Sequence, residues 1–280
     1  MLRLCQHNPN CGDLFRHICE NFGDDIKYDI LTLDWTFFLI AGPAVIFAGI
    51  SKAGFGSGAA FASATALALV VEPGLALGVM LPLLMLIDAA TLKPYWRKWG
   101  ARETWLLTLG GLPGVAIGAA LYRVASPDVL RLLIGAISVG FVIWQLCLRR
   151  GWLRPGSRPM PEWGAALIGV GVGFTSFVSH AGGPLAAVYL LGRDLGKTGF
   201  QATTVLVFWI LNIAKFIPYA ILGMFTWETA QANLVLAPFA LLGAWLGVRA
   251  HHLVPERVFF ALTYILLLIT GSKLIWDGVT

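Results

Sequence analysis

Long uncharged stretches constrain this chain more than any other feature of its sequence. A straight membrane span needs about 20 apolar residues, with a range of roughly 17–25, and most of these stretches reach that length with their flanks. Only 12% of the residues are charged, against about a quarter in soluble domains, so the surface is suited to hydrocarbon. We therefore predict an all-α integral membrane protein. The uncharged stretches are Trp35–Ser51, Ser57–Val71, Pro73–Ile87, Trp105–Tyr122, Leu132–Leu148, Trp163–Ser179, Leu185–Gly192, Thr198–Ala214, Thr229–Val248 and Val258–Ser272.

Two of these stretches, Ser57–Val71 and Leu185–Gly192, are short, and each follows a glycine-rich break. The first break is Ser51-Lys52-Ala53-Gly54-Phe55-Gly56-Ser57-Gly58, and the second is Ser179-His180-Ala181-Gly182-Gly183-Pro184. Backbone groups that leave a helix at membrane depth are tolerated only where protein or a polar cavity satisfies them. The repeated break therefore predicts a cavity in which an anionic substrate meets two opposed helix N-termini.

The two breaks belong to an internal repeat. Equivalent positions are separated by 124 to 128 residues, so one short gap explains the alignment. The aligned landmarks are Lys52-Ala53-Gly54 with His180-Ala181-Gly182, Asp88 with Asn212, and Pro94-Tyr95 with Pro218-Tyr219. The predicted organisation is an N-terminal extension (1–33), a first membrane repeat (34–148), a cytoplasmic linker (149–161), a second membrane repeat (162–276) and a C-terminal tail (277–280).

Each repeat contains five hydrophobic segments, so the two repeats are expected to be inverted relative to each other. The first two segments of each repeat either both cross the membrane or form a re-entrant or broken-helix hairpin. Basic loops favour the cytoplasmic side. Placing 93–102 and 149–158 there also places 193–197 and 249–257 there, with both termini outside. We expect a multi-pass membrane protein with these basic loops on the cytoplasmic side.

Lys52 and His180 occupy equivalent places at the two breaks. A lysine near the bilayer centre costs about 2.5–3.5 kcal/mol on insertion scales, so it normally has a partner or a polar cavity. The alternative is that Lys52 snorkels to the interface. Histidine changes charge near neutral pH, so His180 is a candidate for coupling substrate to a proton; the alternative is a hydrogen-bonded packing residue.

The glycines at the breaks are candidates for binding an anion through backbone N–H groups. Pro184 suits the first turn of a helix that begins near Gly182 and Gly183, whose N–H groups and dipole would face the break. Gly54 and Gly56 are expected to act in the same way at the first break. The alternative is close helix packing through small residues.

A second symmetric pair of polar positions lies on the third segment of each repeat. Asp88 and Thr91 are three residues apart, as are Asn212 and Lys215, so each pair lies on one helix face. Lys215 is the most deeply placed lysine by sequence, and its counter-charge is either Asp88 or a substrate anion. Asp88, Thr91 and Asn212 are therefore predicted to support the site, and an Asp88–Lys215 bridge is the structural alternative.

Other kinds of site find little support in the sequence. Cys5, His7, Cys11, His17 and Cys19 lack the paired spacing of common zinc modules, and no metal or cofactor is expected. The basic residues lie at helix ends, which argues against nucleic-acid binding. Hydrolase triads and nucleotide-binding glycine loops are absent from the sequence, so ATP-driven transport and protease chemistry are not expected.

The motifs at these positions resemble the bacterial sulfite/organosulfonate exporters of the TauE/SafE type. The resemblance rests on Gly49-Ile50-Ser51-Lys52-Ala53-Gly54-Phe55-Gly56, on Ser179-His180-Ala181-Gly182-Gly183-Pro184 and on Asn212-Ile213-Ala214-Lys215-Phe216-Ile217-Pro218-Tyr219. It covers nearly the whole membrane part. It implies export of small sulfur-containing oxyanions, sulfite or sulfonates, by a secondary mechanism. The cysteine-containing N-terminal tail is not part of the resemblance.

The sequence thus predicts a secondary transporter that binds a small anion between two repeats in the lipid bilayer. Substrate-binding candidates are Lys52, Gly54, Gly56, His180, Gly182, Gly183 and Lys215. The alternatives are a transporter of another small anion, a membrane-embedded enzyme that uses His180 and Asp88 as acid and base, and a non-transporting scaffold. A homodimer is compatible with the sequence, which does not fix the oligomeric state.

Overall fold

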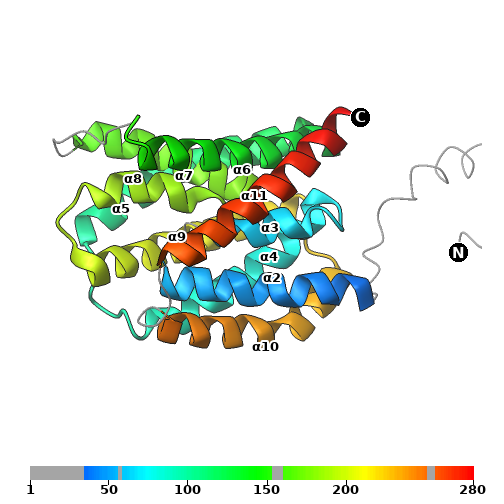
Figure 1. The fold of residues 1–280 in the computed structure, drawn as a ribbon, viewed down its shortest axis with the longest axis horizontal. Coiled ribbons are helices and arrows are strands. Elements are labelled where there is room, and N and C mark those ends of the chain that lie inside the picture. The colour runs from blue at the N-terminus through cyan, green and yellow to red at the C-terminus, as the bar shows by residue number, and fades with distance from the viewer. Residues whose placement is uncertain (1–34, 56–58, 153–159, 251–255) are drawn as a thin grey trace, which may run out of the picture. The chain divides into compact units, whose positions relative to one another are not determined.

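The computed structural model describes residues 35–55, 59–152, 160–250 and 256–280 (Figure 1). In these ranges the secondary structure consists of ten helices and no strand. Eight of these helices are long and apolar enough to cross a membrane. The predicted all-α membrane class is therefore confirmed. The predicted N-terminal extension, with its cysteines, and Gly56 lie outside the described residues.

The described residues of the first half of the chain form five helices. Pro73 and Pro127 occupy the first turns of α4 and α6, where a missing N–H costs nothing. Ser126 caps α6, because its hydroxyl accepts a hydrogen bond from the Val129 N–H at 3.3 Å. The bounds are α2 Trp35–Gly54, α3 Phe61–Leu67, α4 Pro73–Leu92, α5 Ala101–Val124 and α6 Pro127–Arg149.

The second half repeats this order of long and short helices. Its bounds are α7 Glu162–Ser179, α8 Gly182–Leu191, α9 Gly196–Ile221, α10 Trp227–Ala250 and α11 Glu256–Val279. The helix α11 continues to Val279, so most of the segment expected as a C-terminal tail is helical.

Both predicted breaks are present, and each follows a long helix with a short one. At about 1.5 Å per residue, the 7 residues of α3 and the 10 of α8 are too short to span a bilayer. At the second break His180 adopts a left-handed conformation with φ of 55°. The His180 and Ala181 N–H groups then donate to Ser176 O and Thr175 O, both at 3.1 Å, which closes the end of α7. These lengths fit the predicted broken-helix hairpins, and the re-entry of the short segments into the membrane remains a prediction.

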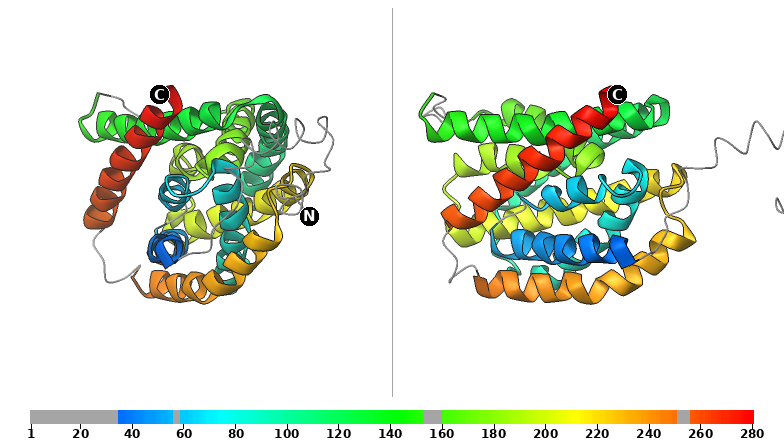
Figure 2. Two further views of the ribbon diagram at one scale, coloured as in Figure 1. Left: turned by 90° about the vertical axis from the view of Figure 1, so that its right-hand side faces the viewer. Right: turned by 45° about the vertical axis from the view of Figure 1, so that its right-hand side comes forward.

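The helix packing follows the predicted duplication. Helix α2 packs against α10, and its counterpart α7 packs against α5; likewise α4 packs against α10 and α9 against α5. The α6 and α11 helices pack against each other, as do α4 and α9. Figure 2 shows α2 in blue beside α10 in orange. Exchanging the two halves maps these pairs onto one another, which is expected of a duplicated unit; the inversion of the repeats remains a prediction.

Glycines allow the two main helix pairs to approach closely. A Cβ at Gly49 would lie 2.6 Å from the backbone carbonyl carbon of Gly243, and one at Gly54 would lie 2.5 Å from Gly247 O. On the other pair, a Cβ at Gly110 would lie 2.5 Å from Ala166 O. Small residues at such contacts are the usual means of packing membrane helices.

We expect Gly49→Leu to destabilise the protein, because its side chain has no space between α2 and α10 and the obstacle is backbone. Overpacking costs roughly 1–3 kcal/mol even where side chains can move, so a melting temperature lower by several degrees is expected. Gly140→Leu is the matched control, since a Cβ there has nothing within 4 Å. Melting of the two purified variants in detergent tests this packing, and equal melting temperatures would contradict it.

The loops separate into two ends of the helical unit. Figure 1 shows the α4–α5 and α8–α9 loops at its left-hand end, and the α5–α6 and α9–α10 loops at its right-hand end. The left-hand loops contain the four basic residues Lys93, Arg97, Lys98 and Arg193 and one acidic residue, Asp194, whereas the right-hand loops, 125–126 and 222–226, contain no charged residue. We call the left-hand end the basic end. Its charge is typical of a cytoplasmic surface.

Candidate functional site

Lys52 and Asp88 form a buried ion pair. Lys52 lies in the last turn of α2, and its Nζ atom is 2.6 Å from Oδ1 and 2.7 Å from Oδ2 of Asp88 on α4. Their exposed fractions are 3% and 0%. The Phe208 ring centroid lies 5.9 Å from the same ammonium. Lys52 therefore does not extend to an interface, and the snorkelling alternative is wrong.

Asp88 also connects the two halves of the chain. Its Oδ2 accepts a hydrogen bond of 2.8 Å from Nδ2 of Asn212, the residue aligned with it in the second repeat. Within the described chain the ion-pair partner of Asp88 is Lys52 and not Lys215. The Asp88–Lys215 bridge considered from the sequence is therefore not formed.

Lys215 is fully buried, and its three hydrogen-bond partners are all neutral. Its Nζ atom lies 3.0 Å from each of three acceptors: the Ser176 carbonyl oxygen, the Ser176 hydroxyl and His180 Nδ1. Among the described residues no carboxylate forms an ion pair with Lys215. A buried ammonium can be solvated in this way by three well-placed acceptors, but its charge is not neutralised.

A protonated Lys215 can only donate, so His180 Nδ1 is the acceptor opposite it, and this assigns the His180 tautomer. Since Nδ1 receives the ammonium proton, the ring proton lies on Nε2, which faces Leu77 O at 3.4 Å. The imidazole is thus neutral in this arrangement. The charges of Lys52 and Asp88 cancel in their ion pair. The four buried side chains of Lys52, Asp88, His180 and Lys215 therefore have one excess positive charge, that of Lys215.

We call Lys52 with Asp88, and Lys215 with His180, the two polar groups. They meet at a small cavity of about 10 Å³. Its polar lining residues are Lys52, Asn212, Ser176 and His180, and Ala60, Leu84 and Phe208 complete the lining. Such a volume is about that of one water molecule. The structure therefore brings the predicted Lys52, His180, Asn212 and their partners together, in an arrangement too tight for a polyatomic anion.

A family model described as "Sulfite exporter TauE/SafE" matches residues 41–274. The chain belongs to the TauE/SafE family. The match confirms the resemblance seen in the motifs, and it includes every residue of the two polar groups. A search of curated proteins and a search of solved structures find no match. As a TauE/SafE protein with eight candidate spans, the chain is a multi-pass membrane transporter of the sulfite and sulfur-anion class.

The glycines of this TauE/SafE chain lie at the breaks, but their surroundings differ. Gly182 and Gly183 are buried in the first turn of α8, beside His180. A Cβ at Gly182 would lie 2.7 Å from the Phe208 ring and from Val172 O, so only glycine fits. Gly54 is the last residue of α2 and packs on α10. Among the described helices at the two breaks, α8 begins with glycines, whereas α3 begins at Phe61 and has seven residues. Anion binding by these glycines remains a prediction.

Thr91 does not join either polar group. Its hydroxyl donates to the backbone of its own helix, at 2.8 Å to Ile87 O and 3.1 Å to Asp88 O. Although it is aligned with Lys215 in the repeat, it supports the helix around Asp88 and does not reach Lys52.

Two tyrosines that were not among the predicted site residues form hydrogen bonds with backbone carbonyls near the ends of α2 and α7, at the breaks. Tyr95 donates to Ala53 O at 3.2 Å, and Tyr219 donates to Phe177 O at 2.6 Å, in each case to a carbonyl 42 residues earlier. Burial raises the pKa of Tyr95, so its hydroxyl remains a donor. The repeat alignment of Pro94-Tyr95 with Pro218-Tyr219 is the signal that pointed to them.

Ser176 and Gln201 also belong to the site and carry no distinctive sequence signal. Ser176 provides two of the three acceptors around Lys215, and Gln201 Nε2 donates to Lys52 O at 2.6 Å. The sequence cue to Ser176 is its position four residues before His180, because residues i and i+4 share a helix face.

Proposed function

We propose that this protein is a secondary transporter that exports small sulfur-containing oxyanions, such as sulfite or organosulfonates, across a bacterial cytoplasmic membrane. The observation that carries the proposal is the buried charge of Lys215, which is solvated by neutral groups only and lies next to a cavity shared by both halves. An anion bound there would neutralise the excess charge and accept charge-assisted hydrogen bonds.

The binding step requires the cavity to widen. The two polar groups come from different helices: Lys52 and Asp88 from α2 and α4, and Lys215 and His180 from α9 and the end of α7. A rocking motion of one repeat against the other would separate them and admit an anion between Lys52 and Lys215. Inverted repeats provide alternating access in this way, and the exchange of helix pairs supports the duplication that such repeats require.

His180 is the group through which a proton would couple to transport. Its Nδ1 atom accepts from Lys215, so a proton arriving at Nδ1 would remove that hydrogen bond and place two cations 3.0 Å apart. Protonation would therefore drive Lys215 away from His180 and change the affinity for the anion. Proton coupling through His180 is part of the proposal.

Flux through proteoliposomes tests the function. Purified protein should release trapped sulfite faster than protein-free liposomes, with methanesulfonate competing and ammonium having no effect. Release no faster than from protein-free liposomes for every sulfur oxyanion would contradict the proposal. Chemical conversion of sulfite in detergent without vectorial flux would favour instead the enzyme that uses His180 and Asp88.

A further inference from the structure

Six of the long helices form two bodies of three, and these bodies differ from the two sequence repeats. Helix α10 of the second repeat packs on α2 and α4, whereas α5 of the first repeat packs on α7 and α9. Among the described helices, α5 has no extensive contact with α2 or α4 of its own repeat, and α10 has none with α7 or α9. We call α2, α4 and α10 body A, and α5, α7 and α9 body B.

Backbone contacts at glycines hold the helices of each body close together. A Cβ at Gly247 of α10 would lie 2.8 Å from Ile50 O on α2, in body A. A Cβ at Gly169 of α7 would lie 2.9 Å from Gly110 Cα on α5, in body B. Of the described glycines, none lies in such backbone contact between α4 and α9, where the two bodies meet. Tight packing resists sliding, so each body is expected to move as a unit.

Each polar group of the central site lies within one body. Lys52 of α2 pairs with Asp88 of α4 in body A. Lys215 of α9 is bonded to Ser176 and His180 at the end of α7 in body B. The hydrogen bonds of the two repeated tyrosines to the helix ends also remain within one body each. Moving the bodies apart therefore separates the two polar groups without breaking either of them.

Three polar side chains of body B face oxygen atoms of body A around the Lys52–Asp88 pair. The contacts are Asn212 Nδ2 to Asp88 Oδ2 at 2.8 Å, Gln201 Nε2 to Lys52 O at 2.6 Å and His180 Nε2 to Leu77 O at 3.4 Å. All three lie at the central site. A single hydrogen bond makes a modest net contribution, so this boundary can open at little cost.

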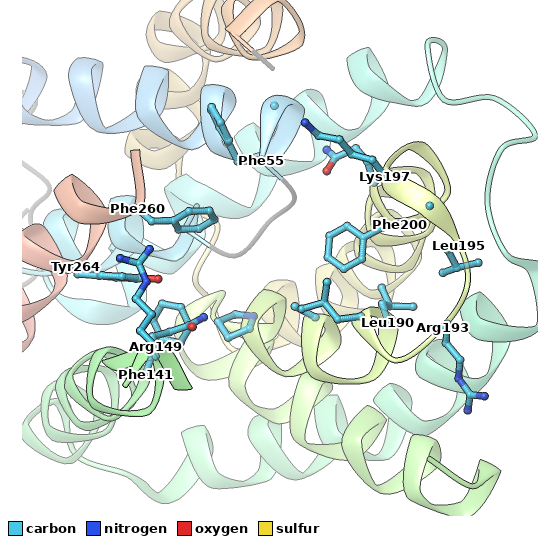
Figure 3. A pocket seen from close by; sticks show the side chains of 17 residues that line it. Phe55, Phe141, Arg149, Leu190, Arg193, Leu195, Lys197, Phe200, Phe260 and Tyr264 are labelled. Carbon is cyan, nitrogen blue, oxygen red and sulfur yellow. The ribbon is translucent and has the colours of Figure 1, made fainter. Parts of the chain in front are cut away.

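The space between the bodies is already wide at the basic end. A cavity of about 610 Å³ lies there, lined by residues from α2, α6, α8, α9 and α11 and their ends (Figure 3). Figure 3 shows Phe55, which follows α2, and Leu190 of α8 on different sides of this cavity. Gln201 also lines it, so the hydrogen bond from Gln201 to Lys52 O lies at the edge of the boundary. Separation at the central site would extend this opening toward Lys215.

Two described loops lead directly from one body to the other. Residues 93–100 join α4 to α5, and residues 222–226 join α9 to α10. Each loop contains one residue with a left-handed backbone, Arg97 with φ of 61° and Gly223 with φ of 72°. The two loops lie at opposite ends of the helical unit (Figure 1). Hinge motions are absorbed by a few loop residues, so these loops are placed to act as the hinges.

We propose that the substrate site opens by separation of body A from body B, and that Gln201 and Asn212 are the positioning residues that hold the two bodies together in the closed site. The moving units are then not the sequence repeats, because each body contains one helix of the other repeat. The link to transport rests on the proposed function and refines its rocking motion. The bodies themselves are measurable without substrate.

Distances between pairs of spin labels on the full chain in nanodiscs test the proposal. The labels replace exposed side chains in a chain whose four cysteines are changed to serine: Leu39 on α2, Ile117 on α5, Trp163 on α7 and Leu242 on α10. The α2–α10 and α5–α7 pairs lie within one body but join two repeats. The α2–α5 and α7–α10 pairs lie within one repeat but join two bodies. With saturating sulfite, only the second two pairs should gain a new distance that differs by several ångströms.

Variants without ligand test the positioning residues. Gln201→Leu and Asn212→Leu each remove one hydrogen bond between the bodies. Each should raise the ratio of separated to closed molecules, measured in the α2–α5 and α7–α10 pairs, by about fivefold, as expected for the loss of one hydrogen bond. Thr203→Val is the matched control. Thr203 is also buried on α9, but its hydroxyl donates to Gly199 O and accepts from Gly100 N, both outside body A. This variant should leave the ratio unchanged.

Several results would overturn the inference. New α2–α10 and α5–α7 distances, with constant α2–α5 and α7–α10 distances, would show that the repeats move as units. Four constant distances with sulfite and in both leucine variants, or equal shifts in Thr203→Val and Gln201→Leu, would contradict it as well.

The two proposals fail separately. The expected distances in Gln201→Leu, with no sulfite flux in proteoliposomes of the wild type, would keep the two bodies and remove the transporter. Sulfite flux in the wild type, with repeats that move as units, would keep the transporter and remove the two bodies.

Discussion

Replacing Lys215 by Met is expected to abolish anion-dependent stabilisation and to reduce sulfite flux by a factor of about 100 or more. A charge-assisted hydrogen bond to a buried group contributes about 1.5–3 kcal/mol, and loss of the excess charge removes the attraction for an anion as well. Thermal melting in a series of sulfite concentrations measures the first effect, because a ligand that binds the native state raises the melting temperature by mass action.

The same variant should remain folded without ligand. Methionine has a similar length and suits an apolar site, and removing an unneutralised buried charge offsets the loss of three hydrogen bonds to Ser176 and His180. Lys273→Met is the matched control, since Lys273 lies exposed on α11 and pairs with Asp277 one turn later. Sulfite stabilisation that is equal in wild type and Lys215→Met would eliminate Lys215 as the anion site.

The positions of the breaks were predictable because they depend on local chemistry. Gly182 and Gly183 interrupt the preceding helix, and Pro184 suits the first turn of the next one. The order of the ten helices in the described residues follows from the uncharged stretches in the same way. The depth of Lys215 was also readable, because it lies in the middle of an apolar helix and is fully buried.

Partner choice was not predictable, since it depends on the packing of distant segments. By sequence Asp88 was as suitable a partner for Lys215 as for Lys52, and only the positions of α2 and α9 around α4 decide the outcome. The same holds for Gly54, whose surroundings are fixed by Gly247, 193 residues later. Tyr95 and Tyr219 were visible as a repeated pair, but their carbonyl acceptors appear only in three dimensions.

The second large effect is expected at the Lys52–Asp88 pair. Asp88→Asn should leave the buried ammonium of Lys52 without a counter-ion, and Lys52→Met should leave the Asp88 carboxylate in the same condition. Removing one member of a buried pair costs about 3–5 kcal/mol, because an uncompensated charge remains. The unfolding free energy in mixed detergent and SDS micelles measures each loss.

The double variant Lys52→Met with Asp88→Asn should recover most of that stability. It contains no buried charge at this position, and the amide oxygen at residue 88 can still accept from Asn212. We expect it to lie within about 1–2 kcal/mol of the wild type, so that the coupling energy of the cycle is several kcal/mol. The exposed Asp128–Arg131 pair on α6 serves as control, with a coupling of about 1 kcal/mol or less. Additive losses at Lys52 and Asp88 would mean that the two side chains act independently. In that case the charge of Lys52 would not be neutralised by Asp88. Lys215 would then no longer be the one lysine of the site with an excess charge, and the argument that selects it as the anion site would fail.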